Sequence, residues 1–123
     1  MLIAAFLILG TAVLLGSALA ILRLRTDGAA APPWWFAGLH GIFAIAGLGC
    51  LLLALRGPPR GLATGTASFG LMAAVLIALA ALVGGGLLAT HLLKRRLPGI
   101  VIGIHATLAV SGFVILAAYL FAG

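Results

Sequence analysis

Four long apolar stretches, none of which contains Lys, Arg, Asp or Glu, follow one another along the chain with short connections between them. They cover residues 2–22, 33–55, 69–93 and 98–121. Each is long enough to cross a bilayer, since about 20 apolar residues span about 30 Å of hydrocarbon. The runs are continuous rather than alternating, and Leu and Ala dominate them, so they predict helices and not the strands of a membrane barrel. We predict an all-α membrane protein in which residues 1–123 form a single transmembrane domain, an up-down four-helix bundle.

Composition supports this prediction and excludes several other classes of protein. Of the 123 residues, 65% are hydrophobic and 7% are charged, and the mean hydropathy is +1.40, far outside the range of soluble domains. The single Cys excludes an internal disulfide and a cysteine-based zinc or iron–sulfur site. The single acidic residue excludes catalysis by paired carboxylates and calcium or magnesium sites built from several carboxylates.

The charged residues of the chain lie in the three connections. They are Arg23, Arg25 and Asp27 after the first span, Arg56 and Arg60 after the second, and Lys94, Arg95 and Arg96 after the third. The first and third connections share a side and hold five basic residues against two. The positive-inside rule therefore places them in the cytoplasm and both termini on the non-cytoplasmic side of a bacterial-type inner membrane. Trp34, Trp35 and Tyr119 lie near span ends, where aromatic belts are expected. Nucleic acid is not an expected partner, because its binding would need a solvated basic face.

An internal repeat relates the second span to the fourth. A shift of the sequence by 65 positions pairs Pro33 with Pro98, His40 with His105 and Gly47 with Gly112, in the shared pattern P-x4-G-[LI]-H-x3-A-x2-G. The coincidence of Pro and His is informative because both are rare in this chain. It predicts that the bundle is built from two repeated helical hairpins. The alternative is that Pro only opens each helix and that Gly is simply common, which would leave the His match alone.

The two repeated histidines are predicted to lie at one depth in the membrane. Each follows its Pro by seven residues, which places both about 10 Å inside the cytoplasmic end at about 1.5 Å per residue. The second and fourth helices of an up-down bundle occupy diagonal corners, so His40 and His105 are expected to face each other across the core. A level, facing pair suits axial ligation of a haem iron. Two alternatives stay open: ligation of another tetrapyrrole such as a chlorophyll, and structural hydrogen bonding between helices.

Glycines and basic residues complete the candidate site. Small residues on the other two helices at the histidine level would leave room for a flat macrocycle, and these are Gly16, Gly84, Gly85 and Gly86. Gly47 and Gly112 lie two turns beyond each His on the same face. Haem propionates at the nearer interface would pair with basic side chains, for which the candidates are Arg23, Arg25, Lys94, Arg95 and Arg96. For any single glycine the alternative is close helix packing, and for the basic residues it is topology alone.

With these residues identified, the sequence resembles the haem-binding four-helix core of membrane b-type cytochromes. The likeness is to cytochrome b of quinol:cytochrome c reductases and, more loosely, to the cytochrome b561 group. In the first family facing histidines on the second and fourth helices hold the haem, and glycines on the first and third let it approach. His40, His105, Gly16 and the run 84–86 match these roles. The family carries a second His about four turns further along each ligating helix, where this chain has Leu53 and Ala54, and Ala118 and Tyr119.

The resemblance implies one haem b per chain and an electron-transfer subunit rather than a stand-alone enzyme. Such a subunit would relay electrons to or from a quinone or a redox-protein partner within the lipid bilayer. The chain has no C-x-x-C-H motif, so attachment of the haem is expected to be non-covalent. His91, near the interface, is the candidate proton partner of a quinone or a hydrogen-bond donor to a propionate; otherwise it is an interfacial residue.

Two other functions are compatible with four apolar spans. The first is a non-enzymatic accessory subunit of a larger respiratory or photosynthetic membrane complex, with Gly-rich helices that pack against partner helices. The second is a small transporter, which the composition disfavours because such exporters depend on an acidic residue inside the membrane and the spans contain none.

Overall fold

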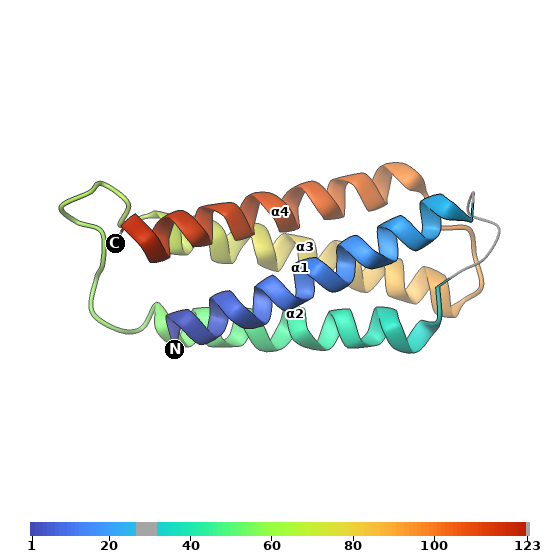
Figure 1. The fold of residues 1–123 in the computed structure, drawn as a ribbon, viewed down its shortest axis with the longest axis horizontal. Coiled ribbons are helices and arrows are strands. Elements are labelled where there is room, and N and C mark those ends of the chain that lie inside the picture. The colour runs from blue at the N-terminus through green and yellow to red at the C-terminus, as the bar shows by residue number, and fades with distance from the viewer. Residues whose placement is uncertain (27–31, 123) are drawn as a thin grey trace.

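The computed structural model describes residues 1–26 and 32–122, and in these residues the chain forms four helices and no strand. The helices are α1 (Leu2–Arg25), α2 (Trp34–Ala54), α3 (Phe69–Leu92) and α4 (Gly99–Ala122). All four are long and apolar enough to cross a membrane. They run alternately in opposite directions and pack side by side as a bundle (Figure 1). The predicted fold class is confirmed.

The helix ends lie within three residues of the predicted spans. The largest difference is at α1, which continues to Arg25 rather than ending at residue 22. A hydropathy pattern ends at the first charge, whereas the helix continues through Arg23 and Arg25. Cations in the last turn interact favourably with the negative end of the helix dipole, so they extend the helix instead of ending it.

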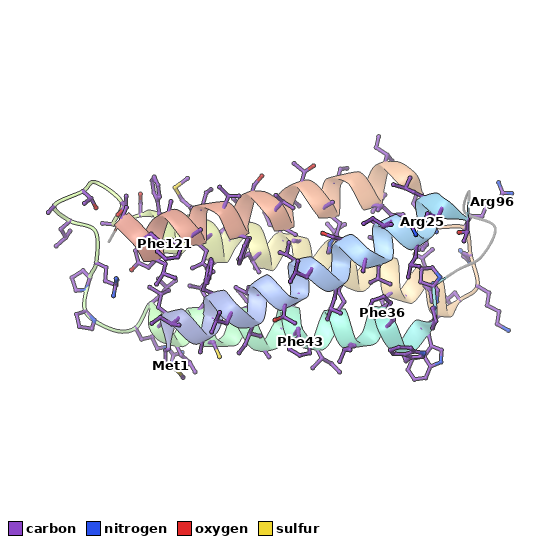
Figure 2. All side chains as sticks on the ribbon, viewed as in Figure 1. Met1, Arg25, Phe36, Phe43, Arg96 and Phe121 are labelled. Atoms are coloured by element: carbon purple, nitrogen blue, oxygen red, sulfur yellow. The ribbon has the colours of Figure 1, made fainter. Side chains whose placement is uncertain are left out.

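The two ends of the bundle differ in charge. The end of α1, the start of α2 and the α3–α4 connection lie at one end of the bundle, and the start of α1 and the end of α4 lie with the α2–α3 connection at the other (Figure 1). Figure 2 labels Arg25 and Arg96 at the first of these ends. We call it the basic end, and its residues are Arg23, Arg25, Lys94, Arg95 and Arg96. Asp27 lies outside the described residues. That the basic end faces the cytoplasm stays a prediction from the positive-inside rule.

The bundle consists of two tight hairpins, α1–α2 and α3–α4, that pack against each other through α2 with α3 and α1 with α4. The backbones of the diagonal pairs, α1 with α3 and α2 with α4, do not approach each other. Within the first hairpin Leu9 of α1 packs onto Gly47 of α2, where a Cβ atom would lie 2.6 Å from the Leu9 side chain. Within the second, Ile77 packs onto Gly112, where a Cβ atom would lie 2.8 Å from Ile77. Glycine is therefore required at both contacts.

These matching contacts show that α1 and α3 are equivalent as well as α2 and α4. Leu9 and Ile77 stand 68 positions apart, and the same shift pairs Ala5 with Ala73, Ala12 with Ala80 and Gly16 with Gly84. The Ala residues of these pairs, with Leu9 and Ile77, are all buried. The two hairpins thus use the same positions for the same packing, as the predicted repeat requires.

Small side chains form much of the buried interior. The buried apolar residues are Ala5, Leu9, Ala12, Leu51, Ala73, Ala74, Ile77, Ala80, Leu116 and Tyr119. Many larger side chains point outward, including Leu14 and its repeat equivalent Leu82, which are 72% and 74% exposed. Lipid tails solvate such side chains as well as a protein core does, so close helix contacts in a membrane depend on small residues rather than on hydrophobicity.

The prediction of an interfacial aromatic belt is wrong for Tyr119 and stays a prediction for Trp34 and Trp35. Trp34 and Trp35 are 64% and 58% exposed at the start of α2, as residues of an interfacial belt would be. Tyr119, predicted to belong to such a belt, is instead 5% exposed in the core. Its ring fills the space above Gly70 of α3, where a Cβ atom would lie 2.8 Å from Tyr119. Because Gly70 has no side chain, the tyrosine ring can pack directly against α3.

Replacement of Gly47 by Ala is expected to destabilise the protein by about 1–3 kcal/mol, the usual cost of overpacking. The new methyl group would meet both the side chain of Leu9 and its backbone nitrogen, the latter at 3.1 Å. Gly49→Ala is the matched control on the same helix, because nothing lies within 4 Å of a Cβ atom there. Thermal unfolding in detergent measures both variants, and equal melting temperatures would contradict the packing described.

Candidate functional site

His40 on α2 and His105 on α4 meet in the middle of the bundle. Their ring centroids are 5.9 Å apart and their planes are inclined at 81°. The sequence predicted that the two lie at one level and face each other across diagonal helices, and this part of the prediction is confirmed. Because the backbones of α2 and α4 do not approach each other, the imidazoles themselves span the space between these helices.

Each imidazole is held by a backbone carbonyl of the neighbouring helix in its own hairpin. The Nδ1–H group of His40 donates to the carbonyl oxygen of Ala12 over 2.8 Å. The Nδ1–H group of His105 donates to the carbonyl oxygen of Ala80 over 2.8 Å. A carbonyl can only accept, so the proton of a neutral imidazole lies on Nδ1 in both residues. The lone pair of each ring then lies on Nε2.

A glycine next to each carbonyl leaves the space that the histidine ring needs to reach it. Gly16 and Gly84 follow Ala12 and Ala80 by four residues, one turn along the helix. A Cβ atom on Gly16 would lie 2.9 Å from Cε1 of His40, and one on Gly84 would lie 2.8 Å from Cε1 of the other histidine. Any side chain at these positions would displace the ring. The sequence suggested that these glycines make room for a macrocycle, and in the structure they make room for the imidazoles.

The other glycines of the predicted site lie elsewhere. Gly85 and Gly86 are exposed, with nothing within 4 Å of a Cβ atom, so the structure does not bring them to the histidine pair. Gly47 and Gly112 lie two turns from the histidines, under Leu9 and Ile77 as described above. Their contacts are those of close helix packing, the alternative that the sequence left open.

The basic residues lie about two to three turns beyond the level of the histidines, toward the basic end. Arg23 is half-buried and donates from Nη2 to the carbonyl oxygen of Leu97 over 3.0 Å, which ties the end of α1 to the α3–α4 connection. Arg25 and Arg95 are exposed at the same end. His91 is half-buried in the last turn of α3, at the position equivalent to Arg23 in the repeat. Both hairpins therefore carry a nitrogen-rich side chain at this level.

Sequence reasoning missed Ala12 and Ala80, whose carbonyls hold the histidines. The signal that could have found them is a second repeat, [LI]-x2-A-x3-G, formed by Leu9, Ala12 and Gly16 and repeated at 77–84. The two copies of this repeat are 68 positions apart, whereas the two His helices are 65 positions apart. The reason is that the first hairpin has three more residues between its Gly and its His than the second hairpin has. No single shift of the sequence aligns both helices of the two hairpins.

Replacement of Gly84 by Ala is expected to displace the ring of His105 and to weaken the bond from its Nδ1–H group to Ala80. The measurement is the ¹⁵N–¹H correlation of each imidazole in protein labelled at histidine. The sample is reduced with dithionite, because any low-spin haem that is bound would then be ferrous and diamagnetic. We expect two protected Nδ1–H signals in the wild type and the loss or shift of only that of His105 in the variant. Gly85→Ala, at the next and open position, should leave both signals in place. An unchanged His105 signal in Gly84→Ala would show that the carbonyl contact is absent.

The histidine pair, its two carbonyls and its two glycines form the candidate site of this chain. Comparison of the chain with models of protein families, with curated proteins and with solved structures found no match. Function is therefore inferred from the residues and contacts of the chain itself.

Proposed function

We propose that this protein is an integral-membrane b-type cytochrome in which His40 and His105 are the axial ligands of one haem b. One observation carries the proposal: the two imidazoles face each other across the bundle with both Nδ1 atoms engaged by carbonyls. Metal-bound histidines commonly donate their other N–H group to such an acceptor, which fixes the tautomer and the ring orientation. The remaining Nε2 atoms are the ligand nitrogens.

The distance and the number of ligands both suit a haem. Two imidazoles that share one metal ion through bonds of about 2 Å have centroids about 6 Å apart, and here the separation is 5.9 Å. Within residues 1–26 and 32–122 no group of three or more His, Cys, Asp or Glu residues gathers to hold a metal. A metal held by this pair would therefore take its other ligands from a non-protein group. A porphyrin supplies four nitrogens and leaves two axial positions, which is what the pair can fill.

The other residues of the site would bind and orient the haem. When bound, the haem would supply a one-electron redox couple. Two histidine ligands would leave no open position on the iron for oxygen, so electron transfer is the role that fits. Arg23 uses one N–H group on Leu97 and keeps others for a propionate, and Arg25 lies at the same end. His91 is the residue we assign to proton exchange with a quinone headgroup at the basic end. The electron partner is a quinone or a redox protein.

The spectrum of the purified protein tests the proposal. After expression with sufficient haem, we expect a sharp b-type α-band on reduction with dithionite and one haem per chain in a pyridine haemochrome assay. His40→Ala and His105→Ala should each abolish haem binding because each removes an axial ligand, whereas His91→Ala should retain the haem. A colourless wild type would contradict the proposal, and a red-shifted pigment spectrum would indicate another tetrapyrrole.

A second variant separates ligation from folding. His105→Met keeps a side chain that can ligate iron, and methionine in place of histidine raises the reduction potential of a haem. We expect this variant to retain haem at a higher midpoint potential, measured by redox titration. A bound haem whose potential is unchanged in this variant would show that His105 is not an axial ligand.

A second candidate function is a non-enzymatic accessory subunit of a larger membrane complex. The observation that favours it is that both histidines already have hydrogen-bond partners in the protein. Each imidazole joins two helices, and such bonds stabilise membrane bundles by about 1 kcal/mol each. In this case the pair serves the fold and the outward glycines serve contacts with partner helices.

Purification from native membranes distinguishes this candidate. An accessory subunit should elute in mild detergent with stoichiometric larger subunits, and without haem of its own. A monodisperse chain that carries haem and no partner would count against the accessory function.

A further inference from the structure

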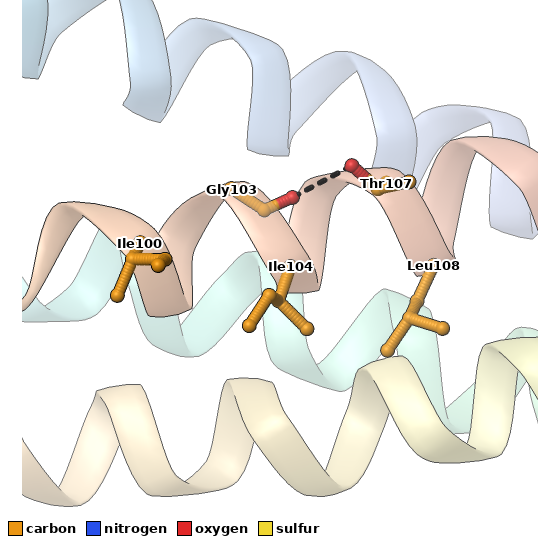
Figure 3. Close-up of a pocket in the computed structure, with 5 residues that line it drawn as sticks. All are labelled: Ile100, Gly103, Ile104, Thr107 and Leu108. Carbon is orange, nitrogen blue, oxygen red and sulfur yellow. Dashed lines mark hydrogen bonds between the residues drawn. The ribbon is translucent and has the colours of Figure 1, made fainter.

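A shallow apolar groove runs along the outer face of α4 and begins in its first turn, next to the basic end (Figure 3). Its volume is about 440 Å³, and its lining is Ile100, Gly103, Ile104, Thr107 and Leu108. Gly103 hollows the groove, because nothing lies within 4 Å of a Cβ atom there. The hydroxyl of Thr107 donates to the carbonyl oxygen of Gly103 over 2.8 Å and is thus engaged within the helix. Such a lining suits a hydrocarbon chain.

Positive charge lies at the mouth of this groove. Lys94, Arg95 and Arg96 are exposed immediately before α4, and Arg25 is exposed at the same end. The described residues contain no Asp or Glu side chain, since Asp27 is the one acidic residue of the sequence. The charge that complements this cluster therefore has to come mainly from outside the chain. Arginine side chains bind phosphate oxygens through paired, charge-assisted hydrogen bonds.

The internal repeat shows that the fold itself does not require this combination. At the equivalent positions of α2, Trp35, Ile42 and Phe43 replace Ile100, Thr107 and Leu108. The five residues before α2 are Ala and Pro, whereas a Lys and two Arg residues come shortly before α4. The two hairpins share the histidines, the glycines under Leu9 and Ile77 and the buried alanines. The combination of this lining with basic residues shortly before the helix occurs in the second hairpin and not at the equivalent sequence positions of the first.

We propose that this surface binds one anionic phospholipid, with its phosphate on Arg95 and Arg96 and an acyl chain in the groove. From Ile100 to Leu108 the groove extends about 12 Å along the helix, which lies within one leaflet of about 15 Å of hydrocarbon. Basic sites beside membrane helices bind anionic headgroups in this way. The site is separate from the histidine pair, and the lipid binds whether or not the chain carries haem.

Native mass spectrometry of the full chain in detergent tests the proposal, because it counts bound lipids. The delipidated protein is offered dioleoyl phosphatidylglycerol or dioleoyl phosphatidylcholine at the same concentration. We expect the first phosphatidylglycerol to bind about tenfold more tightly than phosphatidylcholine, because the choline ammonium of phosphatidylcholine offsets the phosphate charge that the two arginines would pair with. The double variant Arg95→Gln and Arg96→Gln should lose this preference. Its matched control, Arg56→Gln with Arg60→Gln, removes the same charge at the other end and should keep it.

A third variant tests the groove. Gly103→Leu places a side chain in the hollow, and nothing lies within 4 Å of a Cβ atom there, so we expect it to fold as the wild type does and to bind either lipid at least severalfold more weakly. Unchanged phosphatidylglycerol binding in Gly103→Leu would overturn the groove as the acyl site. An equal loss of preference in the two Arg pairs would overturn the headgroup site. A dimer that Gly103→Leu disrupts would show that a second copy of the chain occupies the groove instead. Because the readout is bound lipid, these outcomes are independent of haem binding.

Discussion

The packing of Leu9 onto Gly47, repeated as Ile77 onto Gly112, is the contact on which the rest of the structure depends. Apolar helices in lipid gain little from hydrophobicity when they associate, so close van der Waals contact at small residues holds them together. The contact also sets the register of each antiparallel hairpin. Seven residues along α1 and seven back along α2 from this contact lie Gly16 and His40. The same count on α3 and α4 leads to Gly84 and His105, so helix packing places the histidines.

The histidine pair is the polar centre of a molecule that is apolar almost everywhere else. A polar group left unpaired in hydrocarbon costs several kcal/mol, and each imidazole avoids this cost by its bond to a carbonyl on the neighbouring helix. That bond uses Nδ1 and leaves Nε2, so the contact that stabilises the hairpin also orients a nitrogen that can ligate a metal. Structural and ligating roles are therefore compatible in the same residue.

The two hairpins also act as controls for each other. Features that both share, such as the glycines, the buried alanines and the histidines, are those that hold the bundle and its centre. Features of one hairpin alone need a separate cause. Tyr119 fills the space above Gly70 at the end away from the basic cluster. The groove on α4, with basic residues shortly before it, is the other clear asymmetry, and it lies on the outer surface of the bundle.

The sequence by itself determined the four spans, their order and the common depth of His40 and His105. Apolar length and the rise per residue of a helix set these properties independently of packing. Only the tertiary structure decided which faces of the helices meet. Every face is apolar, so no amphipathic pattern marks the inside, and the positions of Tyr119, Gly85 and Gly86 could not be predicted. Ala12 and Ala80 act through backbone carbonyls, which every residue has, so only the approach of an imidazole from another helix distinguishes them.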